Sequence, residues 1–436
     1  MAAQITRSHR LPVKESQIMD KLNIVGGGQL NGVIPISGAK NAALPLMCLA
    51  LLTDDKLILD GWPDLADTQS MRELLTSLNV ESTMQDDALH MQINGQIGIE
   101  ASYDIVRKMR ASILVLGPLL ARMGAARVSL PGGCAIGTRP VDLHIMVMEK
   151  LGATITLEDG YVLAEAKQGL IGNHITFPML SVGATENALM AAVLAKGQTI
   201  LEHAAKEPEI TDLAECLIAM GAHITGHGTD TIIIDGVDRL GGTDHRVIPD
   251  RIEAGTFAIA AALTGGEVTL QHARPEHLSA LTTLLIQSGA SVTAGDDHMI
   301  VAGHGRPKPV DVTTAPYPDF PTDLQAQFMA LMVMADGVSH VDETIFENRF
   351  MHVPELMRMG ANISVSGGSA TIQGVDGLIG APVMATDLRA SVSLVLAGLV
   401  ASGTTTVQRI YHLDRGYYRL EEKLNACGAN ITRVRE

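Results

Sequence analysis

Aromatic residues are scarce in this chain of 436 residues: they make up 3% of it, with a single Trp. Proteins that bind single-stranded nucleic acid stack the bases on aromatic side chains, so this class is disfavoured. Basic residues are also in deficit, because 32 Lys and Arg face 48 Asp and Glu and leave a net charge of −16. A field of that sign repels nucleic acid and anionic membrane surfaces. We therefore expect no nucleic-acid partner, and any anionic substrate needs a local group of Arg and Lys.

Cysteines are few, and none has a second cysteine at CxxC spacing: they are Cys48, Cys134, Cys216 and Cys427. A chain of this length builds a core without disulfides, and no Cys/His group has the spacing of a zinc site. We expect a reduced, cytoplasmic protein without a metal. Three of the four suit small buried positions. Cys134 differs, because it lies in the glycine-rich loop PGGCAIGTRP, where the cation of Arg139 favours a reactive thiolate.

Long hydrophobic runs of the kind that cross a membrane are missing as well. The longest uncharged run, 390–408, contains Ser and Gly and ends in a Thr cluster, which predicts a buried helix followed by a strand. Residues 1–18 carry three basic residues but no apolar core of a secretory signal. We interpret them as a tag or a disordered extension, with Met19 as a second possible start.

One pattern recurs six times along the chain: the end of an apolar helix, a Gly-Ala step and a β-like run. The Gly positions are 152, 221, 289, 360 and 428, between 68 and 71 residues apart, and Asn79 takes this place in a degenerate first copy. Gly just past a helix end adopts the left-handed conformation without strain. Each copy also contains an apolar run typical of a buried helix, such as ASILVLGPLLARM at 111–123, followed by a β-branched strand. The repeats predict two similar α/β domains of three units each.

Polar residues mark the start of each buried helix, at one repeat position: Lys40 and Asn41; Arg110; Glu186 and Asn187; Arg251 and Glu253; Asp323; Asp387 and Arg389. Asp and Asn are ordinary caps, but Lys and Arg stand at the positive end of the helix dipole, where a cation is disfavoured. Since helix N-termini also attract anions, these cations favour a site for a bound anion; simple capping remains the alternative.

Two further arginines are repeat equivalents in opposite halves of the chain. Arg139 stands 13 residues before Gly152, and Arg415 stands 13 residues before Gly428. If the halves face each other, both guanidinium groups reach one anion in the cleft, and Arg suits bidentate binding of carboxylate or phosphate.

Nine segments resemble the UDP-N-acetylglucosamine enolpyruvyl transferases: GGGQLNGVIPISGAKNAALPLM, VRKMRAS, PGGCAIGTRPVDLH, SVGATENALMAA, EPEI, FPTDLQAQF, ENRFMHVPEL, DLRAS and RIYHLDRGY. The resemblance covers residues 19–436 and all six repeats. It implies an EPSP synthase-like α/β fold, a two-domain inside-out α/β barrel built from six βαβαββ repeats of about 70 residues. By that pattern, 40–248 form one domain, and 19–39 with 249–436 form the other.

The resemblance also implies an activity. The enolpyruvyl group of phosphoenolpyruvate moves to the 3′-hydroxyl of UDP-N-acetylglucosamine by addition and elimination, and phosphate is released. This is the first committed step of peptidoglycan synthesis, which serves cell-wall biogenesis, cell shape and cell division. No cofactor is implied, and fosfomycin is implied as a covalent inhibitor at Cys134.

The family's functional residues map onto this chain one by one. Cys134 matches the general acid, which can carry a pyruvyl adduct, and Asp323 matches the candidate base, with Lys40 and Arg415 completing the catalytic group. The phosphoenolpyruvate contacts map to Lys40, Asn41, Arg139, Arg389 and Arg415. The UDP-sugar contacts map to Arg110, Arg139, Pro140, Val141, Asp142, Leu143, Ser181, Val182, Asp323 and Ile345.

One departure and three alternatives stay open at this point. Met179 stands where the family often has a Lys that contacts the nucleotide, and Met cannot pair with a diphosphate. The first alternative is 5-enolpyruvylshikimate-3-phosphate synthase, against which Cys134 and the RPVDLH motif argue. The second is a non-catalytic UDP-sugar-binding protein on the same fold. The third is a repeat protein without a site, which leaves the cations at the helix starts unexplained.

Overall fold

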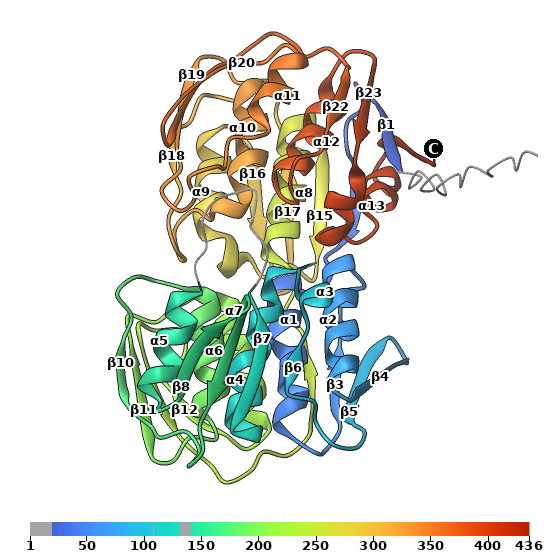
Figure 1. Ribbon diagram of the computed structural model, residues 1–436. Helices are drawn as coiled ribbons and strands as arrows, with labels where there is room; N and C mark the ends of the chain where they lie inside the picture. Colours follow the sequence, from blue (N-terminus) through green and yellow to red (C-terminus); the bar gives the residue numbers. More distant parts are fainter. Residues whose placement is uncertain (1–19, 108, 131–140, 436) are drawn as a thin grey trace, which may run out of the picture.

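The computed structural model describes residues 20–107, 109–130 and 141–435, and its strands form six four-stranded sheets (Figure 1). Every sheet has one parallel and two antiparallel strand pairs, so the six repeats share one topology. Three sheets, in strand order β14-β3-β5-β4, β6-β7-β9-β8 and β10-β11-β13-β12, belong to the first half of the chain. Their strands are β3 (Leu57–Asp60), β4 (Val80–Gln85), β5 (Ala88–Ile93), β6 (Glu100–Ala101), β7 (Ala125–Ser129), β8 (Thr154–Glu158), β9 (Tyr161–Glu165), β10 (His174–Thr176), β11 (Gln198–Glu202), β12 (His223–Thr225), β13 (Thr231–Asp235) and β14 (Thr243–Arg246).

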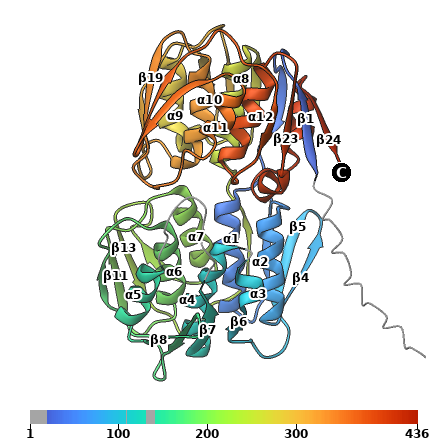
Figure 2. The same ribbon diagram turned by 45° about the horizontal axis from the view of Figure 1, so that its top comes forward.

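The other three sheets combine the second half with the first strands of the described chain. Their orders are β16-β17-β15-β2, β18-β19-β21-β20 and β22-β23-β1-β24, and Figure 2 shows β1 next to β23 and β24. The strands are β1 (Lys21–Val25), β2 (Gly32–Pro35), β15 (Glu267–Gln271), β16 (Ser291–Ala294), β17 (His298–Ala302), β18 (Val312–Thr313), β19 (Val338–Asp342), β20 (Asn362–Ser366), β21 (Ser369–Gln373), β22 (Pro382–Met384), β23 (Thr404–Gln408) and β24 (Asn430–Val434).

Six helices that are buried on nearly every side fill the space between the sheets, as the apolar runs predict. They are α1 (Lys40–Cys48), which continues as the 3₁₀ turn η1 (Leu49–Leu52), α4 (Leu116–Met123) after η2 (Arg110–Val115), α6 (Val182–Ala192), α8 (Arg251–Thr264), α10 (Gln325–Val333) after η4 (Thr322–Leu324), and α12 (Ala390–Val400). Shorter or amphipathic helices lie further out: α2 (Ala66–Ser77), α3 (Tyr103–Val106), α5 (Asp142–Lys150), α7 (Pro208–Ala219), η3 (Pro275–Leu278) with α9 (Ser279–Gln287), α11 (Val353–Arg358), η5 (Ile410–Arg415) and α13 (Leu420–Ala426).

The repeat signature is confirmed in the backbone. All five glycines of the Gly-Ala steps have φ between +93° and +104°, and Asn79 has φ +67°. An Asn tolerates the left-handed region better than most residues with a side chain, which explains how the degenerate copy keeps the same turn.

The predicted helix 111–123 is confirmed only in its second half, since its first turns form the 3₁₀ segment η2. Pro118 has no backbone N–H for an α-helical bond, and the N–H of Gly117 donates instead to Asn187 Oδ1 at 2.8 Å. A Cβ on Gly117 would lie 2.6 Å from the Asn187 carbonyl oxygen, so only Gly allows α4 to approach α6 this closely.

The predicted class is confirmed: helices lie inside, sheets lie outside, and six repeats are divided between two halves (Figure 1). The three sheets of each half stay separate in the described chain and do not join into a continuous barrel. Buried residues form two cores, one running from Ala39 to Ile248 and one combining Leu22–Ile36 with Ile252–Ile431. The domain boundaries 40–248 and 19–39 with 249–436 stay a proposal, which these two cores support.

Candidate active site

The chain passes between the halves twice, and Asp250 ties the two crossings together. Gly38 bridges Pro249, and the N–H of Ala39 donates to the Ile248 carbonyl at 2.7 Å. Asp250 Oδ1 accepts from the first N–H groups of α8, those of Ile252 at 2.8 Å and Glu253 at 2.9 Å. Its Oδ2 accepts from the N–H of Lys40 at 3.2 Å, where α1 has no side-chain cap of its own. One buried carboxylate therefore caps the first helix of both halves.

Lys40 and Arg415 meet on a single carboxylate, that of Asp67 in the first turn of α2. Lys40 Nζ lies 3.3 Å from Asp67 Oδ2, and Arg415 Nε lies 2.8 Å from Asp67 Oδ1. The side chains of Lys40 and Asp67 are only 10% and 6% exposed. Burial is the largest influence on Lys40 and lowers its pKa, while Asp67 works against it. Burial would raise the pKa of Asp67, but the charges of Lys40 and Arg415 outweigh it and hold that pKa below its ordinary value.

Asp323 is held by two buried arginines at the start of α10. Its Oδ1 accepts a hydrogen bond from Arg349, and its Oδ2 lies 3.4 Å from Nε of Arg389, the N-cap residue of α12. The carboxylate itself is 27% exposed, while both arginine side chains are nearly covered. The two guanidinium groups fix the orientation of this carboxylate.

The loop after β19 fastens Ile345 to the same region. Glu343 Oε1 accepts from the N–H groups of Ile345 at 2.9 Å and Phe346 at 3.1 Å. Its Oε2 accepts from Thr322 Oγ1 at 2.8 Å, directly before Asp323. The structure thus brings the predicted sugar-nucleotide contact Ile345 to the segment that carries the predicted base.

The remaining UDP-sugar candidates of the first half gather where α5 and α6 begin. Asp142 is the first residue of α5, flanked by Val141 and Leu143, and Ser181 caps α6 with Oγ accepting from the Ala184 N–H at 3.3 Å. Val182 is the first residue of α6. The two starts are adjacent, because a Cβ on Gly183 would lie 3.2 Å from the ring of His144.

Arg110 opens η2 and acts electrostatically on the same place. Burial, and after it the charge of Arg110, lowers the pKa of His144 to about 4, so the imidazole is neutral at physiological pH. Asn187, which the repeat position had marked, is structural: its Nδ2 lies 2.9 Å from His144 Nδ1 and donates to the Ile113 carbonyl at 3.0 Å.

Arg251 was predicted, as a cation at a helix start, to face a bound anion, and the structure pairs it with a carboxylate instead. Its Nε lies 3.0 Å from Glu209 Oε1 and 3.3 Å from Oε2, with both side chains almost fully buried. This cation of the second half is paired with a carboxylate of α7 in the first half, rather than facing an anion from outside.

Glu186, another residue marked at a helix start, is buried. Burial, followed by repulsion from Glu209 and Glu207, raises its pKa to about 8.

Not every predicted residue can be placed. Cys134, Arg139 and Pro140 lie outside the described residues, and Asn41 is half-buried in the first turn of α1. The other three cysteines are free and buried, as predicted, and burial raises the pKa of the Cys48 and Cys216 thiols. Met179 is 62% exposed.

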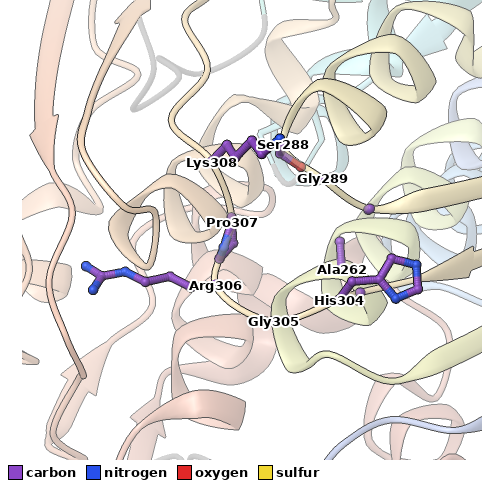
Figure 3. A pocket seen from close by; sticks show the side chains of 10 residues that line it. Ala262, Ser288, Gly289, His304, Gly305, Arg306, Pro307 and Lys308 are labelled. Carbon is purple, nitrogen blue, oxygen red and sulfur yellow. The ribbon is translucent and has the colours of Figure 1, made fainter.

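A small cavity of the described chain lies away from these residues. It has a volume of about 170 Å³ and is lined by His304, Arg306, Lys308 and the ends of α8 and α9 (Figure 3). None of the predicted site residues that the structure describes lines it. Arg306 pairs instead with Asp376 at 2.7 Å. Within residues 20–107, 109–130 and 141–435, no group of three His, Cys, Asp or Glu could hold a metal, and no helix is long and apolar enough to span a membrane.

Three residues of the site escaped the sequence analysis: Asp67, Asp250 and Arg349. Asp67 and Asp250 stand at helix starts, where Asp is an ordinary cap, and nothing local marks their second partners. Arg349 belongs to the quoted segment ENRFMHVPEL but received no role. Together the site offers cations from both halves and an oriented carboxylate, an arrangement that can hold a small dianion and accept a proton from a hydroxyl group.

The chain is similar to known proteins over nearly its whole length. Residues 24–424 match the family model of EPSP synthase (3-phosphoshikimate 1-carboxyvinyltransferase). A UDP-N-acetylglucosamine 1-carboxyvinyltransferase of Rhodopseudomonas palustris (strain TIE-1) is 59% identical over 427 residues, which are 95% of this chain and 100% of that protein. One of Caulobacter vibrioides (strain NA1000 / CB15N) is 59% identical over 425 residues, 96% of this chain and 98% of that one.

Two solved structures share the fold. The enolpyruvyl transferase NikO from Streptomyces tendae matches with a TM-score of 0.84 and 25% identity, over 96% of this chain and 100% of that one. EPSP synthase from Acinetobacter baumannii matches with a TM-score of 0.74 and 20% identity, over 95% and 100%. The chain therefore belongs to the EPSP synthase family and, within it, to the UDP-N-acetylglucosamine 1-carboxyvinyltransferases.

Proposed function

We propose that this chain transfers the enolpyruvyl group of phosphoenolpyruvate to the 3′-hydroxyl of UDP-N-acetylglucosamine and releases phosphate. The observation that carries the proposal is the convergence of Lys40 and Arg415, from opposite halves, on one point beside the oriented carboxylate of Asp323. Relatives that are 59% identical over nearly the whole chain bear the name of this activity.

The proposed reaction has two steps. In the addition, the sugar oxygen bonds to C2 of phosphoenolpyruvate, Asp323 takes the hydroxyl proton, and Cys134 gives a proton to C3, which becomes a methyl group. In the elimination, phosphate leaves the tetrahedral carbon and the methyl group loses a proton, which restores the double bond. Asp323 suits the base because its two arginine partners fix the orientation of its carboxylate, which stays 27% exposed and so accessible to a hydroxyl group.

In this proposal phosphoenolpyruvate is bound mainly by cationic side chains. Its contacts are Lys40, Arg139, Arg389 and Arg415, together with the amide of Asn41. Closure of the two halves excludes water from the reacting atoms. The UDP-sugar contacts are Arg110, the starts of α5 and α6, and Ile345. The proposed location is the cytoplasm, in keeping with the three free cysteines of the described chain.

The test is phosphate release from phosphoenolpyruvate, with UDP-N-acetylglucosamine and separately with shikimate 3-phosphate as acceptor. We expect release only with the UDP-sugar and its loss after treatment with fosfomycin. Release with shikimate 3-phosphate would favour the EPSP synthase alternative. Binding of the UDP-sugar without release would favour the non-catalytic alternative.

Cys134→Ser tests the acid and the inhibitor site together. We expect strongly slowed turnover and resistance to fosfomycin, because the nucleophilic thiolate is gone. Cys216→Ser is the matched control, since that thiol is buried and its pKa is raised by burial. Full inactivation of Cys134→Ser by fosfomycin would remove Cys134 from the proposal.

A further inference from the structure

The segment that carries Arg415 has an unusual backbone at both ends. Arg409, just before η5, has φ +58°, and Arg419, just before α13, has φ +50°. Residues with a side chain avoid this left-handed region because Cβ crowds the carbonyl oxygen. Such a segment keeps its conformation only when its surroundings hold it.

One holding contact lies inside the second half. Tyr417 is buried, and its hydroxyl lies 3.0 Å from Thr256 Oγ1 of α8 and 3.1 Å from Gln327 Nε2 of α10. This contact fixes the inner side of the segment, two residues beyond Arg415. It leaves the outer side, where Asp414 lies, to be held from elsewhere.

The outer side is held by Arg433 on β24, which pairs with β1 (Figure 2). Its Nη2 and Nη1 atoms donate to the two carboxylate oxygens of Asp414 at 2.7 and 3.1 Å. Its Nε donates to Glu421 Oε1 of α13 at 2.6 Å, and Nη1 also lies 3.4 Å from Asp20 Oδ2, just before β1. One guanidinium thus joins three segments of the chain.

The contact needs the geometry of Arg. A planar fork with five donors can bind one carboxylate with two parallel hydrogen bonds and still donate to a second, whereas an ammonium group is a point charge. Isolated ion pairs at partly exposed positions contribute little, but a bidentate pair inside a network fixes geometry. Asp414 is the residue directly before Arg415, so fixing Asp414 fixes the root of the Arg415 side chain.

We infer that Arg433 is a positioning residue for phosphoenolpyruvate binding, acting through Asp414 on Arg415. The inference rests on the proposed role of Arg415 in holding that substrate. From the held segment, Arg415 reaches across to Asp67 of the other half at 2.8 Å. If the segment is loosened, the Arg415 guanidinium occupies several positions, and only some of them allow it to contact phosphoenolpyruvate.

The experiment measures KM for each substrate, kcat and the thermal midpoint for Arg433→Gln. Arg435→Gln is the matched control: it removes the same charge two residues along, and Arg435 is exposed. We expect KM for phosphoenolpyruvate to rise about tenfold in Arg433→Gln, with KM for UDP-N-acetylglucosamine within about twofold of the parent. Arg435→Gln should match the parent in both.

A double-mutant cycle with Asp414→Asn separates positioning from general loosening. If the Asp414–Arg433 contact carries the effect, each single variant raises KM for phosphoenolpyruvate and the double variant is no worse than either. Asp414→Asn also keeps the test open if Arg433→Gln fails to fold. An unchanged KM for phosphoenolpyruvate, or an equal rise for both substrates, would overturn the inference. A parent protein without turnover would instead count against the proposed function.

Discussion

Asp67→Asn removes the charge on which Lys40 and Arg415 meet while keeping the volume of the side chain. In the structure the carboxylate lies 3.3 Å from Lys40 Nζ and 2.8 Å from Arg415 Nε. Removing one member of a buried ion pair costs about 3–5 kcal/mol, because the partner stays buried without a counter-charge. Arg415 is 36% exposed and solvent screens its share, so we expect about 3 kcal/mol.

The same change alters how the protein responds to its small substrate. Asp67 is the strongest influence that opposes the lowering of the Lys40 pKa by burial, so its loss lowers that pKa further. Lys40 in Asp67→Asn then loses its proton at a lower pH than in the parent, and phosphoenolpyruvate binding should weaken earlier as pH rises above neutral. At neutral pH the bound dianion replaces the missing charge. Saturating substrate should therefore stabilise the variant more than the parent.

Thermal unfolding with and without phosphoenolpyruvate checks both parts. We expect a lower midpoint for Asp67→Asn alone, and a smaller difference from the parent at saturating substrate. Asp64→Asn is the control, since Asp64 is exposed and its carboxylate accepts a hydrogen bond from Gln69 Nε2 at 2.6 Å. If Asp67→Asn unfolds like Asp64→Asn and gains no more from substrate than the parent does, the shared carboxylate is not what balances these cations.

Three shorter predictions concern other carboxyl groups. Glu186 has a pKa of about 8 in the fold, so between its unfolded pKa and pH 8 the unfolded chain releases a proton that the fold keeps. The free energy of unfolding should therefore fall by about 1.4 kcal/mol for each unit that the pH rises in that window. Glu186→Gln should remove this pH dependence in thermal unfolding at pH 5 to 8. Asp250→Asn keeps an acceptor for α8 but turns an amide donor toward the Lys40 N–H; we expect lower kcat/KM for phosphoenolpyruvate, with stability between those of the parent and Asp250→Ala. Asp323→Ala should lose turnover yet bind UDP-N-acetylglucosamine within about tenfold of the parent in calorimetry, because it removes the base and one sugar contact but leaves the other UDP-sugar contacts in place; turnover at the parent rate would exclude Asp323 as base.

The repeat architecture was predictable because its signals are local. A glycine past a helix end, an apolar run and a β-branched strand each act within about ten residues, and all six left-handed positions appear where the spacing places them. The start of the helix at 111–123 was not predictable in the same way. Its 3₁₀ form depends on Asn187, 70 residues further along, which draws away the N–H of Gly117.

Cations at helix starts predicted a place for the candidate site, which stays a prediction, and they gave no information about its charge balance. The pairs that decide the balance join distant residues: Asp67 with Arg415 across 348 positions, and Glu209 with Arg251 across 42. An Asp in the first turn of a helix looks the same whether it only caps that helix or also neutralises a cation from the other half.

The cations of the candidate site already have carboxylate partners in the structure. Lys40 and Arg415 share Asp67, Arg389 and Arg349 share Asp323, and Arg251 is held by Glu209. If phosphoenolpyruvate binds as proposed, a dianion that reaches Lys40 and Arg415 exchanges partners with Asp67 instead of filling an unbalanced positive field. Because the Asp67 contact also joins the two halves, the exchange ties substrate affinity to their relative position. Under the proposed function, Asp250 acts on that position because it caps the first helix of both halves, and Arg433 acts on the placement of Arg415 through Asp414. Both residues then alter affinity without touching substrate.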